Sequence, residues 1–410
     1  MDVLYPRCAG LDVHQKTVVA CVRIHGGGGR AQTETRTFAT HTAALIELSQ
    51  WLTERECTHV AMEATGVYWK PVWHILEGNF ELVLANARFV RNVPGRKSDV
   101  NDATWLADLL AHGLIRSSFV PPQPIQELRD LTRTRKQLVR QRAQHVNRIH
   151  KVLEDANVKV GSLITDITGK SGLAILNALI SGEQNPNTLV ELTSTRLKTP
   201  RPDLVLALQG KVTAHHRFML KMHLEQVDGV DRSLAQLDAQ IEEKTHPLAE
   251  VADRLQQIPG MSSLAARVVL AEIGPDMSQF PTAGNLVSFA GLCPRMDESA
   301  GKKHSVKLRK GSNWLKSTLV SCAWAAARSK DTYARAQFHR IKARRGSKRA
   351  VVAVAASMLT TIYYVLKRGT DYLDPGPKFF EQRDHKRIAK RLQKRLEDLG
   401  YSVQLSTAAA

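Results

Sequence analysis

The first part of the chain alternates between short apolar runs and stretches in which apolar residues recur at helical spacing. Residues 11–14 and 17–24 are β-branched and apolar, which predicts two strands. A period-two pattern over 33–39 predicts a third strand, paired with the second as a hairpin across the glycines at 26–29. Further along, the pattern predicts a helix over 42–55, a strand over 58–64, a helix over 68–76, a strand over 80–85 and a helix over 99–114. A hairpin meander followed by alternating helices and strands is typical of an α/β layered domain.

Beyond a proline-rich segment, helical spacing extends over much longer stretches. Residues 125–155 predict one long helix, whose apolar stripe is diluted by Arg135 and Arg142 near heptad core positions. This dilution favours a partner-binding helix or a loose coiled coil over a regular zipper. A second long amphipathic helix is expected over 204–246, and residues 156–203 predict short helices at most.

The C-terminal part is expected to be mainly helical over 247–370, with a charged helix over 379–399. Residues 350–366 are uncharged for 17 positions, which is near the lower limit for a membrane span. Because this stretch contains one serine and two threonines, we interpret it as a buried core helix and expect no membrane span. The five cysteines are scattered and form no CxxC pair, which fits a reducing cytoplasm.

These patterns predict four parts of the chain: an α/β domain over 1–122, a helical connector over 123–246, a mainly helical domain over 247–375, and a charged helical tail over 376–410.

Positive charge is concentrated in two of these parts. The chain has 58 Lys and Arg against 39 Asp and Glu, a formal net charge of +19. Residues 1–125 are balanced with 12 of each sign, 129–151 hold eight basic residues and one acid, and 302–349 hold 15 basic residues and one acid. Such clustering indicates a polyanionic partner and says nothing about the fold.

Four carboxylates in the balanced domain are candidate metal ligands. Asp12 and Glu63 stand in predicted apolar strands, where acids are uncommon, and Asp99 and Asp102 stand three apart at a predicted helix start. Taken singly, Asp99 can be a helix cap and Asp102 a first-turn acid. Convergence of all four would be costly without a hard divalent cation, and Mg²⁺ suits phosphate chemistry.

A helix, a Pro-Gly turn and a second helix are expected over 255–273, in the outline of a helix-hairpin-helix. The usual second glycine is replaced by Ser262, so a structural helical turn is an equal alternative to phosphate binding. Ser299 is expected in a polar loop over 297–303, beside Lys302 and Lys303.

The order of the carboxylates resembles the RuvC-like, RNase H-type nuclease fold. The segments GLDVHQKTVVACV, MEATGVYWKPVWHIL and GRKSDVNDATWLADLLAHGLI are similar to the N-terminal domain of the DEDD insertion-sequence transposases of the insertion-sequence-one-ten family. The similarity resumes at LQQIPGMSSLAARVVLAEIG, NLVSFAGLCPRMDESAGKK and LRKGSNWLKSTLVSCAWAAAR, and only 156–250 is not diagnostic. Several segments in one order are more specific than a single motif.

The resemblance implies an RNase H-like (RuvC-like) N-terminal domain, a helical or coiled-coil connector and a mainly α transposase domain that carries a catalytic serine. It implies that the four carboxylates hold Mg²⁺, or Mn²⁺ in its place, and that Ser299 attacks a DNA phosphate to form a phosphoserine intermediate. In the family, glycine usually follows this serine directly. Here Ala300 intervenes before Gly301, which leaves Ser305 as a weaker candidate.

The resemblance also implies donor and target DNA, a structured non-coding guide RNA, and a dimer or tetramer in which one protomer's carboxylates face another's serine. The connector helix is a candidate RNA and oligomer contact, and the basic run of the C-terminal domain, with Trp314 in it, a candidate phosphate-binding surface. The candidate nucleic-acid-binding residues are Arg135, Lys136, Arg140, Arg142, Arg148, Lys302, Lys303, Lys307, Arg309, Lys310, Trp314, Arg344 and Arg345.

The leading hypothesis is a cytoplasmic, RNA-guided DNA recombinase that moves its own element. One alternative is a RuvC-like nuclease that hydrolyses branched DNA with metal-activated water and does not need Ser299. Another is a nucleic-acid-binding scaffold without catalytic activity.

Overall fold

The computed structural model describes residues 2–26, 31–64, 66–87, 90, 101–193, 199–294, 297–299, 301–305 and 307–404, with the backbone alone for 297–299, 302–305 and 384–388. The chain divides into two compact units, Met1–Val120 and Pro121–Ala410.

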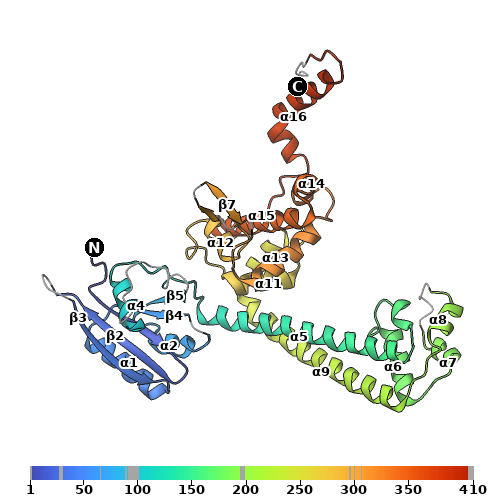
Figure 1. Ribbon diagram of the computed structural model, residues 1–410, viewed down its shortest axis with the longest axis horizontal. Helices are drawn as coiled ribbons and strands as arrows, with labels where there is room; N and C mark the ends of the chain where they lie inside the picture. Colours follow the sequence, from blue (N-terminus) through green and yellow to red (C-terminus); the bar gives the residue numbers. More distant parts are fainter. Residues whose placement is uncertain are drawn as a thin grey trace. The chain divides into compact units, whose positions relative to one another are not determined.

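The first unit is built on a mixed five-stranded sheet in the order β3-β2-β1-β4-β5 (Figure 1). The strands are β1 (Arg7–Val13), β2 (Thr17–Ile24), β3 (Gln32–Ala39), β4 (His59–Glu63) and β5 (Glu81–Ala85). The first three form an antiparallel meander, and β4 and β5 run parallel to β1. The predicted hairpin and the predicted alternation after it are confirmed, and the sheet is compatible with the expected RNase H-like class.

Helices cover both faces of this sheet. On one face, α1 (Thr42–Glu54) and α2 (Trp69–Leu76) enclose a core that includes Leu11 and Met62. On the other face, α4 (Asp102–Ala111) packs directly on β1 at Gly10, where an added Cβ would lie 2.2 Å from the carbonyl oxygen of Ala103. Only glycine allows this close approach of the two backbones.

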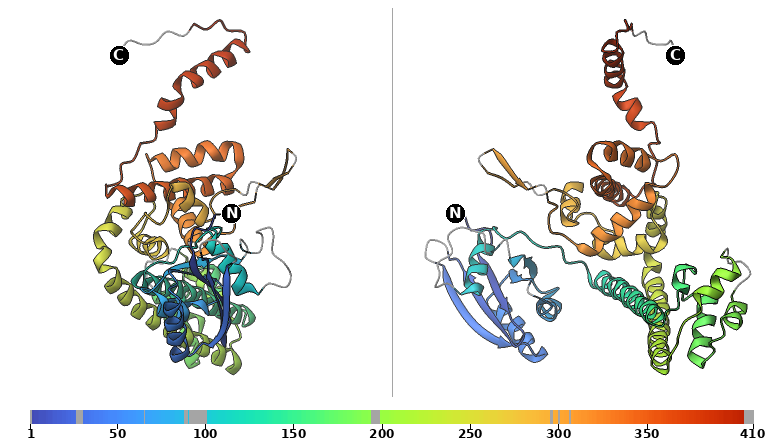
Figure 2. Two further views of the ribbon diagram at one scale, coloured as in Figure 1. Left: turned by 90° about the vertical axis from the view of Figure 1, so that its left-hand side faces the viewer. Right: turned by 45° about the vertical axis from the view of Figure 1, so that its right-hand side comes forward.

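The second unit begins with two long antiparallel helices, α5 (Gln123–Asp155) and α9 (Ala214–Thr245) (Figure 2). Lys244 donates to Glu127 at one end of the pair, at 2.7 Å, and His216 contacts Asp155 at the other end, at 2.9 Å. The second helix was expected from residue 204 but starts at 214, because the side chains of Thr213 and His216 form a capping box there.

The segment between the two helices forms a small packed domain of its own. Helices α6 (Lys170–Ser181), α7 (Pro186–Glu191) and α8 (Arg201–Ala207) pack with the adjoining ends of α5 and α9 around a common hydrophobic core. The expected short helices are confirmed. The core was not expected, because its apolar positions are shared among several short elements and no one helix shows a long stripe.

The remaining helices of the second unit are α10 (Ala249–Gln256), α11 (Ser263–Ile273), α12 (Ala283–Phe289), α13 (Asn313–Ala326), α14 (Tyr333–Arg345), α15 (Ser347–Arg368) and α16 (Phe379–Glu397), and two strands, β6 (Asp297–Ser299) and β7 (Lys302–Ser305), form a hairpin. Within the described residues, α15 is long and apolar enough to cross a membrane, but 50% of its apolar window is buried in the protein. It packs against α10, α12, α13 and α14, and the buried Tyr363 hydroxyl donates to the carbonyl of Phe280 at 3.1 Å. These contacts make α15 the core helix predicted from the sequence.

Candidate functional site

Two of the candidate carboxylates lie side by side at the carboxyl end of the sheet. Leu11 of β1 pairs with Met62 of the parallel strand β4, so the next residues, Asp12 and Glu63, are neighbours across the two strands. Because side chains alternate along a strand and Leu11 and Met62 point into the core under α1 and α2, Asp12 and Glu63 point to the face covered by α4. The Asp12 side chain is 21% exposed.

Helix α4 brings a third carboxylate to the same edge. The helix runs antiparallel to β1: Ala111 near its end accepts from the amide of Leu4, and Ala103 near its start packs on Gly10. Asp102, the first residue of α4, therefore lies over the carboxyl end of β1. The cap of this helix is Asn101, whose side chain accepts from the amide of Ala103, and not Asp99 as the simplest interpretation of the sequence had it.

The helix expected over 99–114 begins at Asp102 in the structure, three residues later than predicted. The shared face of Asp99 and Asp102 stays a prediction. Asp99 itself lies outside the described residues.

The donor set at this edge is chemically suited to a hard divalent cation, since it consists of carboxylate oxygens. Within the described ranges no group of three or more His, Cys, Asp or Glu side chains is close enough to hold a metal ion. The structure also adds His14, whose Nε2 lies 3.1 Å from Asp12 Oδ2. Sequence reasoning missed this contact, although the spacing of two residues in Asp-Val-His could have indicated it.

Ser299 lies in a hairpin and not in the expected loop. It is the last residue of β6 and pairs with Lys302 of β7. Gly301, just before Lys302, has a φ of 75°, a backbone conformation that favours glycine. Ser305 pairs with Asp297 at the open end of the same hairpin, so the two candidate nucleophiles lie at opposite ends of it.

Several of the basic residues assigned to nucleic acid are engaged within the second unit. Arg135 and Arg142 donate in bidentate fashion to Asp238 and Asp231 of α9, over 2.5–3.1 Å and 2.6–3.0 Å respectively. These pairs give the two arginines of the apolar stripe a role in fixing the register of α5 on α9.

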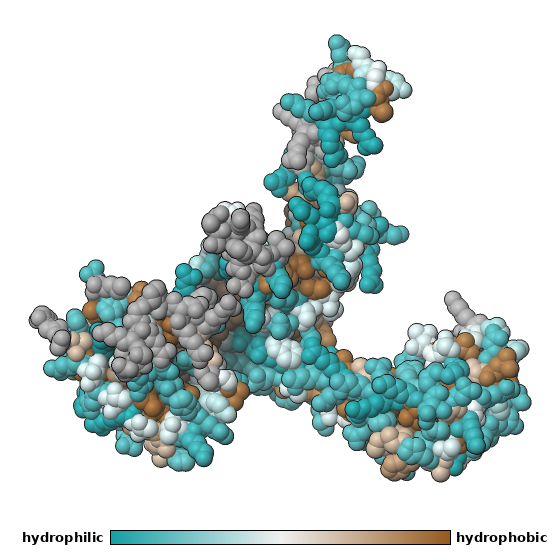
Figure 3. Space-filling model, viewed as in Figure 1, coloured by the Kyte–Doolittle hydropathy of each residue, from teal (hydrophilic) through white to brown (hydrophobic). Residues whose placement is uncertain are grey.

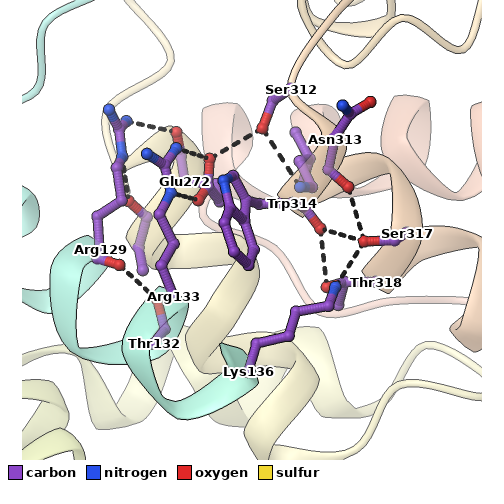
Figure 4. Close-up of polar contacts among 12 residues, drawn as sticks. Arg129, Thr132, Arg133, Lys136, Glu272, Ser312, Asn313, Trp314, Ser317 and Thr318 are labelled. Carbon is purple, nitrogen blue, oxygen red and sulfur yellow. Dashed lines mark hydrogen bonds and ion pairs between the residues drawn. The ribbon is translucent and has the colours of Figure 1, made fainter. Parts of the chain in front are cut away.

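The ring of Trp314 in α13 faces the cations of α5. Arg133, Lys136 and Arg140 lie 5.7, 5.8 and 5.7 Å from its centroid. Lys136 also donates to Ser317 at 2.5 Å (Figure 4). Burial lowers the pKa of the Lys136 ammonium group. Among the other candidates the side chains of Lys302 and Lys303 are not described, while the exposed ones are Arg140, Arg148, Lys307, Arg309, Lys310, Arg344 and Arg345.

A buried ion pair, which the sequence did not reveal, joins α5, α11 and the start of α13. Glu272 is 0% exposed and accepts from both Nε and Nη2 of Arg133, at 2.7 and 2.9 Å, and from the hydroxyl of Ser312 at 3.0 Å (Figure 4). Ser312 also caps α13, and Arg129 donates to the backbone carbonyls of Ala271 and Glu272. The network ties the helix that follows the Ser299 hairpin to the long helix α5.

The Pro-Gly turn before α11 has a structural role in the same domain. A Cβ on Gly260 would lie 2.3 Å from the carbonyl oxygen of Cys322 in α13, and the hydroxyl of Ser262 caps α11 by accepting from the amide of Ala265. Both residues are therefore occupied by contacts within the domain.

Replacing Glu272 by alanine is expected to lower the free energy of unfolding by about 2–3 kcal/mol, because it removes the buried acceptor of the half-buried Arg133 guanidinium and of the Ser312 hydroxyl. Urea denaturation of the full chain measures this loss. Glu250→Ala is the control: it removes an exposed i,i+4 pair with Arg254, whose expected contribution is below about 1 kcal/mol. A loss from Glu272→Ala no larger than that of the control would contradict the importance given to the network.

Both units contain segments that are similar to known transposases. Residues 9–158 match the DEDD family model of the IS110 type, described as "Transposase", and residues 252–339 match the "Transposase IS116/IS110/IS902 family". The transposase for insertion sequence element IS1328 of Yersinia enterocolitica is 25% identical over 284 residues, 68% of this chain and 73% of that protein. An uncharacterized 43.6 kDa protein of insertion element IS110 from Streptomyces coelicolor is 32% identical over 140 residues, 34% of this chain and 33% of that protein. The transposase for IS1111A of Coxiella burnetii is 26% identical over 226 residues, 54% of this chain and 62% of that protein.

The two matched domains and the transposase relatives identify the chain as a transposase, an enzyme that cuts and rejoins DNA. Within that class, the chain belongs to the IS110 (insertion-sequence-one-ten) family of insertion-sequence transposases, as the resemblance predicted.

Proposed function

We propose that this transposase cuts and rejoins DNA with a divalent metal held by Asp12, Glu63, Asp99 and Asp102 and with Ser299 as nucleophile, guided by a structured RNA. The observation that carries the metal part is the register of β1 and β4, which makes Asp12 and Glu63 neighbours at the sheet edge where α4 begins with Asp102. Carboxylates on adjacent parallel strands meet at one edge without any loop rearrangement.

The bound cation, Mg²⁺ or Mn²⁺, would neutralise charge on the reacting phosphate. The residues around it have separate tasks. Asp12, the carboxylate on the central strand, is held in place by the sheet, and the contact with His14 fixes the direction of its Oδ2. The packing of Gly10 on Ala103 fixes the start of α4, and with it Asp102, against the same edge.

The chemical step exchanges one phosphodiester for another. The Ser299 oxygen loses its proton and forms a bond to phosphorus, and the bond from phosphorus to the departing deoxyribose oxygen breaks, with that oxygen taking a proton. A deoxyribose hydroxyl of the new strand then attacks the phosphoserine, which restores DNA and frees Ser299. Each step makes one P–O bond and breaks one, so no nucleotide triphosphate is consumed.

The direct test is to trap the intermediate. Incubation of the purified protein with its guide RNA, labelled donor and target DNA, and Mg²⁺ should produce a protein–DNA adduct that survives denaturing electrophoresis. Peptide mapping by mass spectrometry should place the adduct on the peptide that contains Ser299. Cleavage to free ends with no adduct at any time point would instead favour hydrolysis by water, as in a RuvC-like nuclease.

The partners are also part of the proposal: donor and target DNA, a guide RNA, and further copies of this chain in a dimer or tetramer, in the cytoplasm. The exposed cations along α5 and in the C-terminal domain support a polyanionic partner.

Tagged protein from cells that carry the whole element is expected to retain one discrete RNA through a high-salt wash, and its sequence should map beside the gene. A structured guide should remain bound because its contacts include stacking and shape recognition, whereas purely electrostatic contacts weaken steeply with salt. Sequencing of the retained RNA makes the measurement, with protein from cells that lack the flanking DNA as control. A smear of ribosomal and transfer RNA in both samples would contradict RNA guidance.

A further inference from the structure

A hollow of about 440 Å³ lies in the C-terminal domain, lined by the second half of α15, the start of α14 and the loop that precedes α16. It is distinct from the serine hairpin and from the α5–α13 contact. Its lining combines aromatic rings with hydroxyl groups. The residues that matter are Tyr333, Tyr364 and Tyr372 among the rings, and Ser357, Thr360 and Thr361 among the hydroxyls.

The loop that forms one wall of this hollow is firmly held. Asp374 accepts from the hydroxyl of Tyr372 at 2.9 Å and from the backbone amides of Tyr333 and Gly376 at 2.9 and 2.7 Å. Gln257 of α10 donates to Asp371 at 3.2 Å and accepts from the amide of Tyr372 at 3.1 Å. The two acidic residues near the hollow are therefore engaged by the protein itself, and the wall is preformed.

The rim of the aromatic hollow carries Arg368 and also Asp371, whose carboxylate lies 3.9 Å from Nε of Arg254. Arg368 lies 4.9 Å from the ring centroid of Tyr364, and this tyrosine is 43% exposed. Beyond the loop, a second hollow of about 460 Å³, the cationic hollow, is lined by Lys330, Arg335 and His339 and by one acid, Asp331. In the described part of the chain no carboxylate lies within ion-pair distance of Arg368, Lys330 or Arg335.

The two hollows share their dividing wall. The start of α14 contributes Tyr333 to the aromatic hollow and Thr332 to the cationic one, and the loop contributes Pro375 to the first and Pro377 to the second. Hydrophilic side chains predominate on the surface over α14 (Figure 3). The aromatic hollow and the cationic hollow lie on either side of one short wall. This arrangement suits the base and the phosphate of a nucleotide.

We infer that the aromatic hollow takes one unpaired nucleobase of a single strand, and that the cationic hollow takes a neighbouring phosphate. Rings that stack on a base, with hydroxyls at its edges and cations along the backbone, are the usual means of binding single strands. The charged side chains of the lining are Arg368 and Asp371, and Asp371 is held by Gln257, so we expect many bases to be accepted. A base within a duplex is stacked and paired and cannot enter. This inference rests on the proposed function in so far as the ligand is nucleic acid, and it concerns binding and not the serine or metal chemistry.

The test is a binding titration of the full chain by fluorescence anisotropy, in EDTA so that strand cleavage plays no part. The probes are a labelled 15-nucleotide oligo-dT, an oligo-U of the same length, and a 15-base-pair duplex. Tyr364→Ala is expected to weaken single-strand binding roughly 5- to 50-fold, the scale of one lost stacking contact. Duplex binding should stay within about twofold, because exposed cations dominate it.

Three further variants separate the loss of base stacking at Tyr364 from effects that any lost tyrosine or lost cation would have on binding. Tyr364→Phe keeps the ring and should bind as the parent chain does, and Tyr401→Ala removes a tyrosine of similar type, 65% exposed, from outside the hollow. Arg335→Ala should weaken single-strand binding in proportion to one lost phosphate contact. A photoreactive 4-thiothymidine in the oligo-dT should crosslink to the peptide that contains Tyr364, which gives a readout that does not depend on affinity.

The outcomes decide the inference and identify the strand. If Tyr364→Ala loses more affinity for oligo-U than for oligo-dT, the aromatic hollow binds RNA. If it loses more affinity for oligo-dT, the hollow binds DNA. Equal losses for single strand and duplex in Tyr364→Ala, or crosslinks confined to other peptides, would overturn it. The binding test does not depend on Ser299 or on the carboxylates. A negative result in it therefore does not affect the catalytic proposal, and a negative result in the catalytic tests does not affect the inference about single-strand binding.

Discussion

Ser299→Ala is expected to lower the rate of DNA strand transfer by roughly 10⁴-fold or more, the scale on which removal of a catalytic nucleophile acts. Under the proposed mechanism, the variant loses the oxygen that holds the cut strand before it is joined to its new partner. Binding of DNA and RNA should be unchanged, because one hydroxyl at the turn of a hairpin contributes little to a polyanion-binding surface. Single-turnover assays with labelled donor and target strands measure the rate, and gel-shift titrations measure binding.

Ser305→Ala is the matched control for that prediction. It removes the same group from the other end of the same hairpin, where Ser305 pairs with Asp297. Strand transfer should survive in this variant. A loss confined to Ser305→Ala would move the nucleophile to that end, and free cut ends from both variants at the parent rate would favour hydrolysis by water.

The fold of the first unit could be predicted from the sequence because each of its elements carries its own pattern. The strand 59–63 is apolar at each of its central positions, and the helix 42–54 shows leucines at helical steps. The small domain between α5 and α9 could not be predicted, because Ile149, Ile175 and Leu224 belong to separate helices and meet only in three dimensions. Local periodicity does not contain such contacts.

In the candidate site, too, residues with a local sequence pattern could be predicted, and contacts between distant segments could not. Asp12 and Glu63 could be singled out because acids interrupt apolar strands, and the register of the sheet makes them neighbours. Glu272 stands in a helix where an acid is ordinary, so nothing in its local sequence indicates burial. Its partner Arg133 lies 139 positions away in the chain. A pair of that kind is visible only once the two helices are packed.

The arginines of α5 show how a correct pattern can support more than one role. Their position in the apolar stripe indicated a special function, and binding of RNA was one reasonable interpretation. The structure gives Arg135 and Arg142 bidentate partners on α9, in the geometry that guanidinium groups form with carboxylates. An RNA phosphate would have to compete with these carboxylates, whereas Arg140 and Arg148 are exposed and form no ion pair with a carboxylate within the described residues.

Asp12→Asn is expected to lower the rate of DNA cleavage by at least about 10³-fold at a fixed Mg²⁺ concentration, because it removes one anionic ligand from a site that depends on them. The change is nearly isosteric, and Asp12 sits on the central strand with its side chain 21% exposed, so the sheet should keep its packing. Metal affinity should fall as well, and titration with Mn²⁺ followed by electron paramagnetic resonance measures it without any DNA present.

Two comparisons make this result specific to the metal. Raising the metal concentration should restore part of the activity of Asp12→Asn and none of that of Ser299→Ala, since only the first variant is limited by metal binding. Asp108→Asn removes the same charge from the second half of α4, where Asp108 pairs with Arg23 at 3.0 Å, and should cleave at nearly the parent rate. If Asp12→Asn and Asp108→Asn lost activity equally, the effect would come from the stability of the first unit, and the carboxylate edge would lose its assignment as the metal site.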